Sequence, residues 1–178
     1  MSANHQKTRF QIETATEDDW PWIVQGEVEI ACVRLDPERQ KELSRQLIEE
    51  RVARRVARIR KENGFPNVAF VARTSEGELA GFVWVARTHN DFTGQLEASL
   101  MSQYVEESHR GKGLGHQLLE TAEAWAHQQG LPRISLCIGA NNTIGQRLYE
   151  SLGYQVETLR MSKKLGPEEP EEIHLDDA

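Results

Sequence analysis

Cysteine is scarce in this 178-residue sequence, which contains only Cys32 and Cys137. Two thiols cannot form a disulfide framework or a cysteine-rich zinc site, and they suit a reducing compartment. Long apolar runs are also missing, since none approaches the roughly 18 residues of a membrane-spanning helix. The first ten residues contain no apolar signal-peptide core. We therefore expect a cytoplasmic protein that does not enter membranes.

An overall excess of basic residues is missing as well. Lysine and arginine number 21, against 28 acidic residues, and the formal net charge is −7. Six of the acids fall in residues 166–178, and leaving them out gives −1 for residues 1–165. A near-neutral body is atypical of nucleic-acid-binding proteins, so we expect no nucleic-acid partner. We predict a single domain over residues 1–165 and an acidic, disordered tail over residues 166–178.

The first third of the chain has the hydrophobic periodicity of one strand followed by helices. Residues 9–13 alternate between apolar and polar as in a strand. Thr16 and Asp19 have the spacing of a capping box, and the apolar residues that follow recur at helical spacing. Asp36-Pro37 then predicts a helix start and Asn63-Gly64 a helix end, so we expect one long helix between them.

The remainder of the chain alternates strand-like and helix-like patterns. A hairpin is expected where two apolar runs flank the turn at residues 75–78. This order of elements predicts an α+β fold in which the first three central strands form a meander and the later strands alternate with helices. The elements expected are strands over residues 68–72, 79–85 and 95–105, a helix over 114–130, a strand over 134–138, a helix around 144–152, and one or more strands within 154–164.

The most informative stretch is residues 104–115, YVEESHRGKGLG, where a glycine-rich turn joins a strand to an amphipathic helix. Unpaired backbone N–H groups and the positive end of the helix dipole converge at such a turn. Three glycines leave room for an anion to reach the backbone, and two basic residues add positive charge. The pattern predicts a phosphate site, although plain strand-to-helix turns use glycine too. The residues are Arg110, Gly111, Lys112, Gly113 and Gly115.

Two common phosphate motifs do not fit this turn. The pattern G-x-x-x-x-G-K-[ST] fails because Gly113 follows Lys112, and G-x-G-x-x-G fails because His116 stands at a glycine position. The turn does contain Arg-x-x-Gly-x-Gly, formed by Arg110, Gly113 and Gly115. This signature resembles the pyrophosphate-binding motif of the GCN5-related N-acetyltransferase (GNAT) superfamily.

A second segment, residues 142–154 (NTIGQRLYESLGY), resembles the Asn-x-x-Ala-x-x-Leu-Tyr-x-x-x-Gly-Phe segment of the same superfamily. Gly145 replaces the usual alanine, which lowers helix propensity there by up to ~1 kcal/mol, and Tyr154 replaces phenylalanine. The resemblance covers residues 79–165 well and residues 9–78 only through the order of elements. It implies a three-layer GNAT-like fold, with a central, splayed mixed β-sheet flanked by helices.

By this resemblance the chain is an acyltransferase that transfers the acetyl group of acetyl-CoA directly to a primary amine, without a metal. Tyr149 stands where the family's phenol commonly faces the cofactor sulfur and can act as a general acid; packing in the core is the alternative. Asn142 would contact the cofactor or acceptor, or serve only as a helix cap. The cofactor-binding residues implied are Tyr104, Val105, Arg110, Gly111, Lys112, Gly113, Leu114, Gly115 and Asn142.

The general base is less well defined by the sequence. Glu97 lies on the strand before the glycine turn, where relatives often carry an acid, but a solvated strand residue is the alternative. Together with Asp91, Glu106 and Glu107, it suggests a cationic acceptor. Cys137 is expected to be a buried small residue.

Several other features of the sequence leave alternatives open. The tryptophans at positions 20, 22 and 84 could line an acceptor pocket or pack in the core. The histidines show no metal-ligand spacing. The chain could instead be a non-catalytic acyl-CoA-binding regulatory module, or an interaction domain that uses its basic helix or acidic tail. The acceptor is not identified, and a homodimer is compatible with the resemblance.

Overall fold

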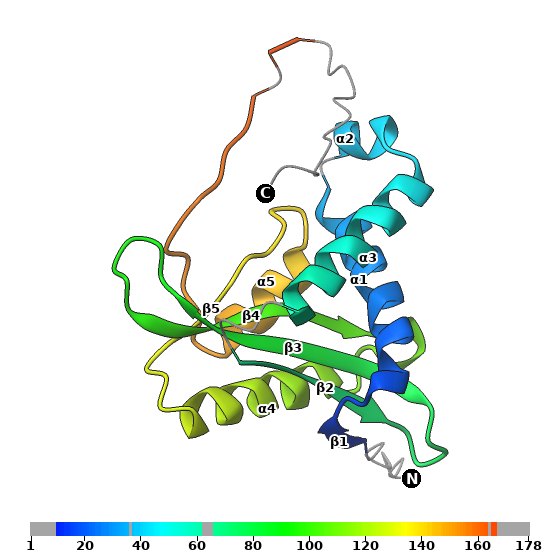
Figure 1. The fold of residues 1–178 in the computed structure, drawn as a ribbon, viewed down its shortest axis with the longest axis vertical. Coiled ribbons are helices and arrows are strands. Elements are labelled where there is room, and N and C mark those ends of the chain that lie inside the picture. Colours follow the sequence, from blue (N-terminus) through cyan, green and yellow to red (C-terminus); the bar gives the residue numbers. More distant parts are fainter. Residues whose placement is uncertain (1–9, 36, 62–65, 164, 167–178) are drawn as a thin grey trace, which may run out of the picture.

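A five-stranded mixed sheet forms the centre of the molecule in the computed structural model, which describes residues 10–35, 37–61, 66–163 and 165–166 (Figure 1). The strands follow one another in chain order across the sheet. The first four are antiparallel and the last pair is parallel, which confirms the expected mixed sheet. The strands are β1 (Gln11–Thr14), β2 (Asn67–Arg73), β3 (Leu79–His89), β4 (Leu96–Val105) and β5 (Ile134–Leu136).

Helices cover both faces of this sheet. Figure 1 shows α1 and α3 over one face and α4 over the other, so the expected three-layer architecture is confirmed. Tyr149 of the helix α5 and Leu152, which directly follows that helix, pack against the same core as α4. The helices are α1 (Trp20–Arg34), α2 (Pro37–Glu42), α3 (Arg45–Lys61), α4 (Leu114–Gln128) and α5 (Thr143–Ser151), with short 3-10 turns η1 (Glu17–Asp19) and η2 (Glu107–His109).

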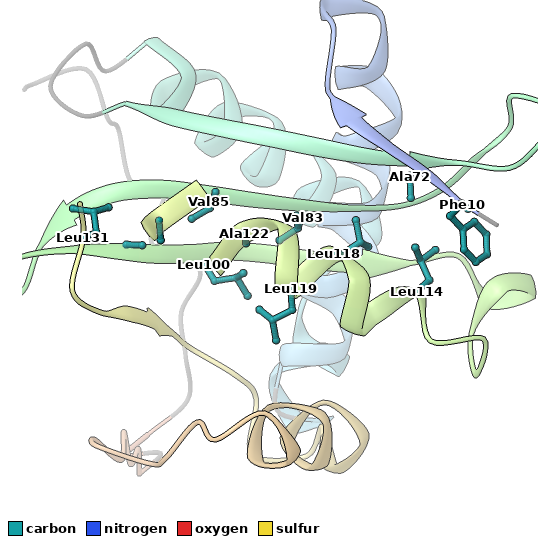
Figure 2. Packing of buried hydrophobic residues seen from close by; sticks show 13 residues of the cluster. Phe10, Ala72, Val83, Val85, Leu100, Leu114, Leu118, Leu119, Ala122 and Leu131 are labelled. Carbon is teal, nitrogen blue, oxygen red and sulfur yellow. The ribbon is translucent and has the colours of Figure 1, made fainter. Parts of the chain in front are cut away.

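Two hydrophobic cores meet at β3, because this strand is buried on both faces. Val83 and Val85 face α4, whereas Phe82 and Trp84 face α1 and α3. A strand buried on both sides has a nearly continuous apolar sequence, as LAGFVWVA does here. Figure 2 shows the α4 core, to which Leu114, Leu118, Leu119 and Ala122 contribute from the helix.

The prediction of one long helix after Pro37 is wrong, since the structure has two helices there. The first ends at Glu42 and the second begins at Arg45. The Ser44 hydroxyl accepts a hydrogen bond from the Leu47 backbone N–H at 3.2 Å, as a residue at a helix N-terminus does. Serine thus offers the backbone a local alternative to a continuous helix. The predicted end signals, Asp36 and Asn63-Gly64, lie outside the described residues.

The strand expected within residues 154–164 is also wrong for the described part, residues 154–163, which contains no strand. Val156, Leu159 and Met161 are between 74% and 91% exposed. In a strand, Val156 would face one side of the sheet and the other two the opposite side, so no continuous apolar face exists to bury. Residue 164 and the predicted tail from 167 onward lie outside the described residues.

Two smaller differences concern β5 and its surroundings. The strand ends at Leu136, earlier than expected, and Cys137 is exposed instead of buried. The expected hairpin, the strand over residues 95–105 and the helices over 114–130 and 144–152 are confirmed within a few residues. Among the residues that the structure describes, none of the helices combines the length and apolar character that a bilayer crossing needs.

Candidate functional site

The glycine-rich turn leads from β4 through η2 directly into α4. Gly111 and Gly113 have φ angles of +73° and +81°, a left-handed conformation that glycine adopts without steric cost. Gly113 is also the N-cap of α4, where no side chain accepts the first backbone N–H groups. Those groups have no partner inside the helix. The turn therefore presents free N–H donors and the positive end of the helix dipole to solvent.

The two basic residues of the turn have different surroundings. Arg110 donates from Nε to the Val105 carbonyl oxygen at 3.0 Å, which fixes the guanidinium beside the end of β4. Lys112 is exposed between the two glycines. The predicted anion site is thus built from backbone donors and one solvent-facing ammonium group.

Gly115 and Leu114 contribute to packing at the start of α4. A Cβ atom on Gly115 would lie 3.3 Å from Leu148 Cδ2, so the missing side chain lets α5 approach α4 closely. Leu114 is 1% exposed and anchors this end of the helix in the core. The start of α4 is consequently packed against both the core and α5.

One edge of β4 is open beside this turn. Its pairing with β5 covers only Ala98–Leu100, whereas its pairing with β3 continues to Val105. An extra residue, Met101, forms a bulge opposite the step between Trp84 and Val85. Within the described chain, residues 101–105 therefore have no strand partner on the β5 side.

The backbone direction in this part of β4 follows from its hydrogen bonds. Glu106 donates its N–H to Ala80 in β3 at 2.9 Å. Alternate residues of a strand turn their N–H and C=O groups to opposite edges. The backbone groups of Tyr104 therefore also point toward β3, whereas those of Gln103 and Val105 point toward the open edge. The Tyr104 ring stacks against Phe82 on the α1 side. The open edge is therefore formed by the backbones of Gln103 and Val105.

Tyr149 is joined to the glycine turn through Gln103. The Tyr149 hydroxyl donates to Gln103 Oε1 at 3.1 Å, and Gln103 Nε2 donates to the Gly115 carbonyl oxygen at 2.5 Å. Burial raises the pKa of Tyr149 to about 12, although the nearby Arg34 guanidinium acts in the opposite direction. The phenol therefore keeps its proton at neutral pH. Sequence reasoning missed Gln103, whose only signal was a polar residue within a largely apolar strand.

Asn142 caps α5. Its side-chain oxygen accepts the Gly145 backbone N–H at 2.9 Å, as the helix-cap alternative expected. A Cβ atom on Gly145 would lie 2.7 Å from Ile138 Cδ1 and 2.8 Å from the Asn142 amide nitrogen. This crowding explains why glycine stands where alanine is usual in the motif.

Glu97 lies at the opposite end of β4 from the glycine turn. It is 8% exposed and accepts hydrogen bonds from Asn90 Nδ2 at 3.3 Å and Ser135 Oγ at 2.9 Å, so the solvated alternative does not hold. Six residues of strand separate it from Gln103, which corresponds to about 20 Å. The structure therefore does not bring Glu97 and Tyr149 together.

The other acids that suggested a cationic acceptor are dispersed. Asp91 lies in the loop before β4, near Glu97 in sequence, whereas Glu106 and Glu107 follow the far end of the strand. Glu106 accepts a hydrogen bond from the Tyr104 hydroxyl at 3.1 Å. No single acidic surface is formed by these four described residues.

A buried carboxylate, Glu27 of α1, was not singled out from the sequence. It is 2% exposed and accepts hydrogen bonds from Ser102, next to the β4 bulge, and from Arg55 Nη1 at 3.0 Å. A buried charge is costly unless it is paired, and here both carboxylate oxygens are engaged. Its partners are 75 and 28 residues away in sequence, so no local pattern could reveal the pairing.

The remaining candidates fall outside the site. Trp20, Trp22 and Trp84 all pack in the α1 and α3 core, which favours the packing alternative. Within the described ranges, no group of three His, Cys, Asp or Glu side chains comes together as metal ligands.

Comparison with known proteins gives a consistent picture. The model of the acetyltransferase (GNAT) family matches residues 29–154. The uncharacterized N-acetyltransferase YdgE of Bacillus subtilis is 33% identical over 90 residues, which are 51% of this chain and 56% of that protein. The chain thus spans little more than half the length of such curated relatives.

Solved structures agree with the fold along most of the chain. A candidate acetyl transferase from Pyrococcus furiosus has a TM-score of 0.75 and 27% identity, with 88% of this chain and 100% of that chain covered. The aminoglycoside enzyme AAC(6')-Iy, solved with a CoA-linked bisubstrate analogue, shares the fold with a TM-score of 0.65 at 17% identity and coverages of 88% and 99%. Since the family model spans well over half of the sequence, the chain belongs to the acetyltransferase (GNAT) family.

Proposed function

We propose that the chain is an N-acetyltransferase that transfers the acetyl group of acetyl-CoA directly to the primary amine of a small molecule or peptide. The observation that carries this proposal is the uncapped glycine N-terminus of α4 beside the open edge of β4. Membership of the family supports the reaction type. A site for phosphate groups and an adjoining strand edge suit a long ligand with an anionic head and amide groups along its arm.

The residues of the turn fit the proposed cosubstrate. The N–H groups at positions 111–115 and the Lys112 ammonium would hold the pyrophosphate, since donors at a helix N-terminus stabilise anions. The backbone of Gln103 at the open edge would pair with the pantetheine amides as an additional strand does, whereas the Val105 carbonyl oxygen already accepts a hydrogen bond from Arg110. Arg110 supports the end of β4, and Asn142 fixes the start of α5.

In the proposed reaction, the amine nitrogen attacks the thioester carbonyl carbon, a C–N bond forms and the C–S bond breaks. The acceptor enters as an ammonium group and leaves as an amide, so one proton goes to the CoA thiol and one to solvent. A backbone N–H at the open edge, that of Val105, would stabilise the developing oxyanion. The chain itself supplies alignment, which accounts for much of the rate in such transfers.

Tyr149 would act on the leaving sulfur as a hydrogen-bond donor once its hydroxyl turns away from Gln103 Oε1, the acceptor it has in this structure. Its pKa of about 12 exceeds the ordinary thiol pKa of ~8.5 by roughly 3.5 units, so complete proton transfer to the thiolate is uphill by about 5 kcal/mol. A hydrogen bond to a charged acceptor is nevertheless worth roughly 1.5–3 kcal/mol. We therefore propose that Tyr149 stabilises the thiolate while largely retaining its proton.

The proton acceptor for the amine is a separate question. The separation of about 20 Å along β4 argues against direct action of Glu97 on the atoms that Tyr149 would touch. Proton removal by Glu97 would require a chain of water molecules. The buried Glu27 carboxylate accepts a hydrogen bond from Ser102, which is next to the bulge at Met101.

The experiment is isothermal titration of the protein with acetyl-CoA, followed by free-thiol release across a panel of primary amines. Binding together with amine-dependent thiol release is the expected result. Binding without release for any amine would favour the regulatory module, and no binding would overturn the interpretation of the glycine turn. Desulfo-CoA, which retains the phosphates, separates recognition of the nucleotide part from recognition of the thioester.

A further inference from the structure

A hollow of about 560 Å³ lies between the end of α1, the helix α2, the start of α3 and the loop before α5. Its volume is within the usual range for small-molecule sites, roughly 300–1,000 Å³. None of the sequence patterns pointed to it, because its walls come from four separate segments. The lining residues are Glu29, Cys32, Val33, Leu35, Gln40, Leu43, Arg45, Ile48 and Asn141.

The lining combines an apolar wall with one pair of opposite charges. Leu35, Leu43 and Ile48 supply apolar surface. Arg45 Nη2 and Glu29 Oε1 are 2.5 Å apart, with side chains 58% and 45% exposed. Both charges are thus accessible to a ligand in the hollow.

Arg45 has a second anchor that does not line the hollow. Its Nε donates to Glu49 Oε1 at 3.0 Å, one helical turn further along α3. The guanidinium would therefore keep its place if Glu29 exchanged partners. An exposed ion pair contributes little to stability, so a ligand that offers each member a new counter-ion can open it.

We propose that this hollow binds the zwitterionic head of an α-amino acid with an uncharged side chain. This inference rests on the proposed function, because that amino acid would be the acetyl acceptor. The ligand ammonium pairs with Glu29 and its carboxylate with Arg45, while the side chain packs on Leu35, Leu43 and Ile48. A polycation fits poorly, because the lining holds one acid and one base and has no surplus of negative charge.

The end of α1, which lines the hollow, is bonded to the segment that precedes the helix of Tyr149. Asn141 Nδ2 donates to the Val33 carbonyl oxygen at 2.9 Å, and Arg34 Nη2 donates to the Cys137 carbonyl oxygen at 2.6 Å. These bonds join α1 to the segment between β5 and α5. The helix that carries Tyr149 begins two residues after Asn141.

The kinetic test compares L-leucine with L-leucinamide, which lacks the carboxylate, and uses spermidine as the polycation. We expect Arg45→Gln to raise the KM of leucine at least tenfold and to change that of leucinamide less than twofold. Glu29→Gln should raise both. Arg54→Gln is the matched control, because Arg54 also lies on α3 and pairs with Glu50 at 3.9 Å, but does not line the hollow. Equal effects of Arg45→Gln on both amines, or spermidine as the preferred acceptor, would overturn the proposal.

A binding test separates this inference from the proposed function. Cys32 lines the hollow and Cys137 is exposed outside it, so alkylation by iodoacetamide, read by mass spectrometry, reports occupancy with an internal reference. Without acetyl-CoA, L-leucine should slow modification of Cys32 at least threefold and leave Cys137 unchanged. Protection without thiol release from acetyl-CoA would refute the transferase but retain the amino-acid site. Thiol release with other amines and no protection of Cys32 would refute the site alone.

Discussion

Replacing Gly113 with aspartate should weaken cosubstrate binding while leaving the fold intact. The left-handed backbone at φ +81° costs a residue with a side chain up to about 1–2 kcal/mol, although asparagine and aspartate tolerate it best. A Cβ atom there meets nothing within 4 Å, so no steric clash adds to the cost. For a chain of this size, 1–2 kcal/mol corresponds to a melting-temperature decrease of about 2–8 °C.

The charge acts on binding, whereas the backbone strain acts on stability, so the two effects can be measured separately. One carboxylate about 5 Å from two phosphate charges is repelled by about 1.7 kcal/mol in water and about 6.6 kcal/mol at an effective dielectric constant of 20. We therefore expect Gly113→Asp to weaken acetyl-CoA binding at least tenfold relative to Gly113→Asn, which has the same shape and backbone strain. Titration calorimetry and thermal melting measure the two quantities.

Gly77 provides the matched control for backbone strain. It has φ +86°, nothing within 4 Å of its Cβ position, and a place in the hairpin between β2 and β3. Gly77→Asp should lower the melting temperature by a similar amount and leave binding unchanged. If Gly113→Asp and Gly113→Asn bound acetyl-CoA equally, the interpretation of this turn as a phosphate site would be refuted.

Three further predictions concern single side chains. Tyr149→Phe should lower kcat about 10–100-fold and leave the affinity for acetyl-CoA unchanged. Tyr154→Phe, which loses only a hydrogen bond to Glu123, should retain kcat. Equal kcat in both variants would exclude Tyr149 from the reaction. Glu97→Gln should change kcat less than about threefold, and loss of the acidic limb of its pH–rate profile would contradict this. Burial tends to raise the pKa of Asp19, but hydrogen bonds from Thr16 and Arg73 outweigh this effect and lower the pKa. This carboxylate therefore stabilises the fold above its ordinary pKa and loses that contribution as the pH falls below about 4. Acid unfolding of Asp19→Asn should show a weaker pH dependence in that range.

Local sequence patterns predicted the parts of the molecule that local physics determines. The turn at Gly111 and Gly113 was predictable because glycine combined with a following amphipathic helix leaves few alternatives. The hairpin between β2 and β3 was predictable from the change to a period of two. The break before α3 was missed because Ser44 competes with a helical pattern that otherwise continues through it.

Contacts between distant residues limited prediction of the site. Gln103 lies 46 residues from Tyr149, and Glu27 lies 75 residues from Ser102, so neither pair has a local signature. The hollow between α1 and α3 depends on the same kind of long-range packing. The prediction of a last strand failed for a different reason. It relied on local apolar content, although Val156 and Leu159 would lie on opposite faces of a strand.

The amide of Gln103 gives the proposed transfer site its coherence. A single side chain donates to the first turn of α4 at Gly115 and accepts from Tyr149 on α5, while its own backbone forms part of the open edge of β4. The phosphate turn, the strand edge and the phenol therefore share one hydrogen-bonded chain. A ligand that ordered the first turn of α4 would also fix the Gly115 carbonyl oxygen, and through Gln103 it would fix the position of the Tyr149 hydroxyl oxygen. On the proposed function, binding of the phosphates and placement of the phenol would therefore be coupled through Gln103.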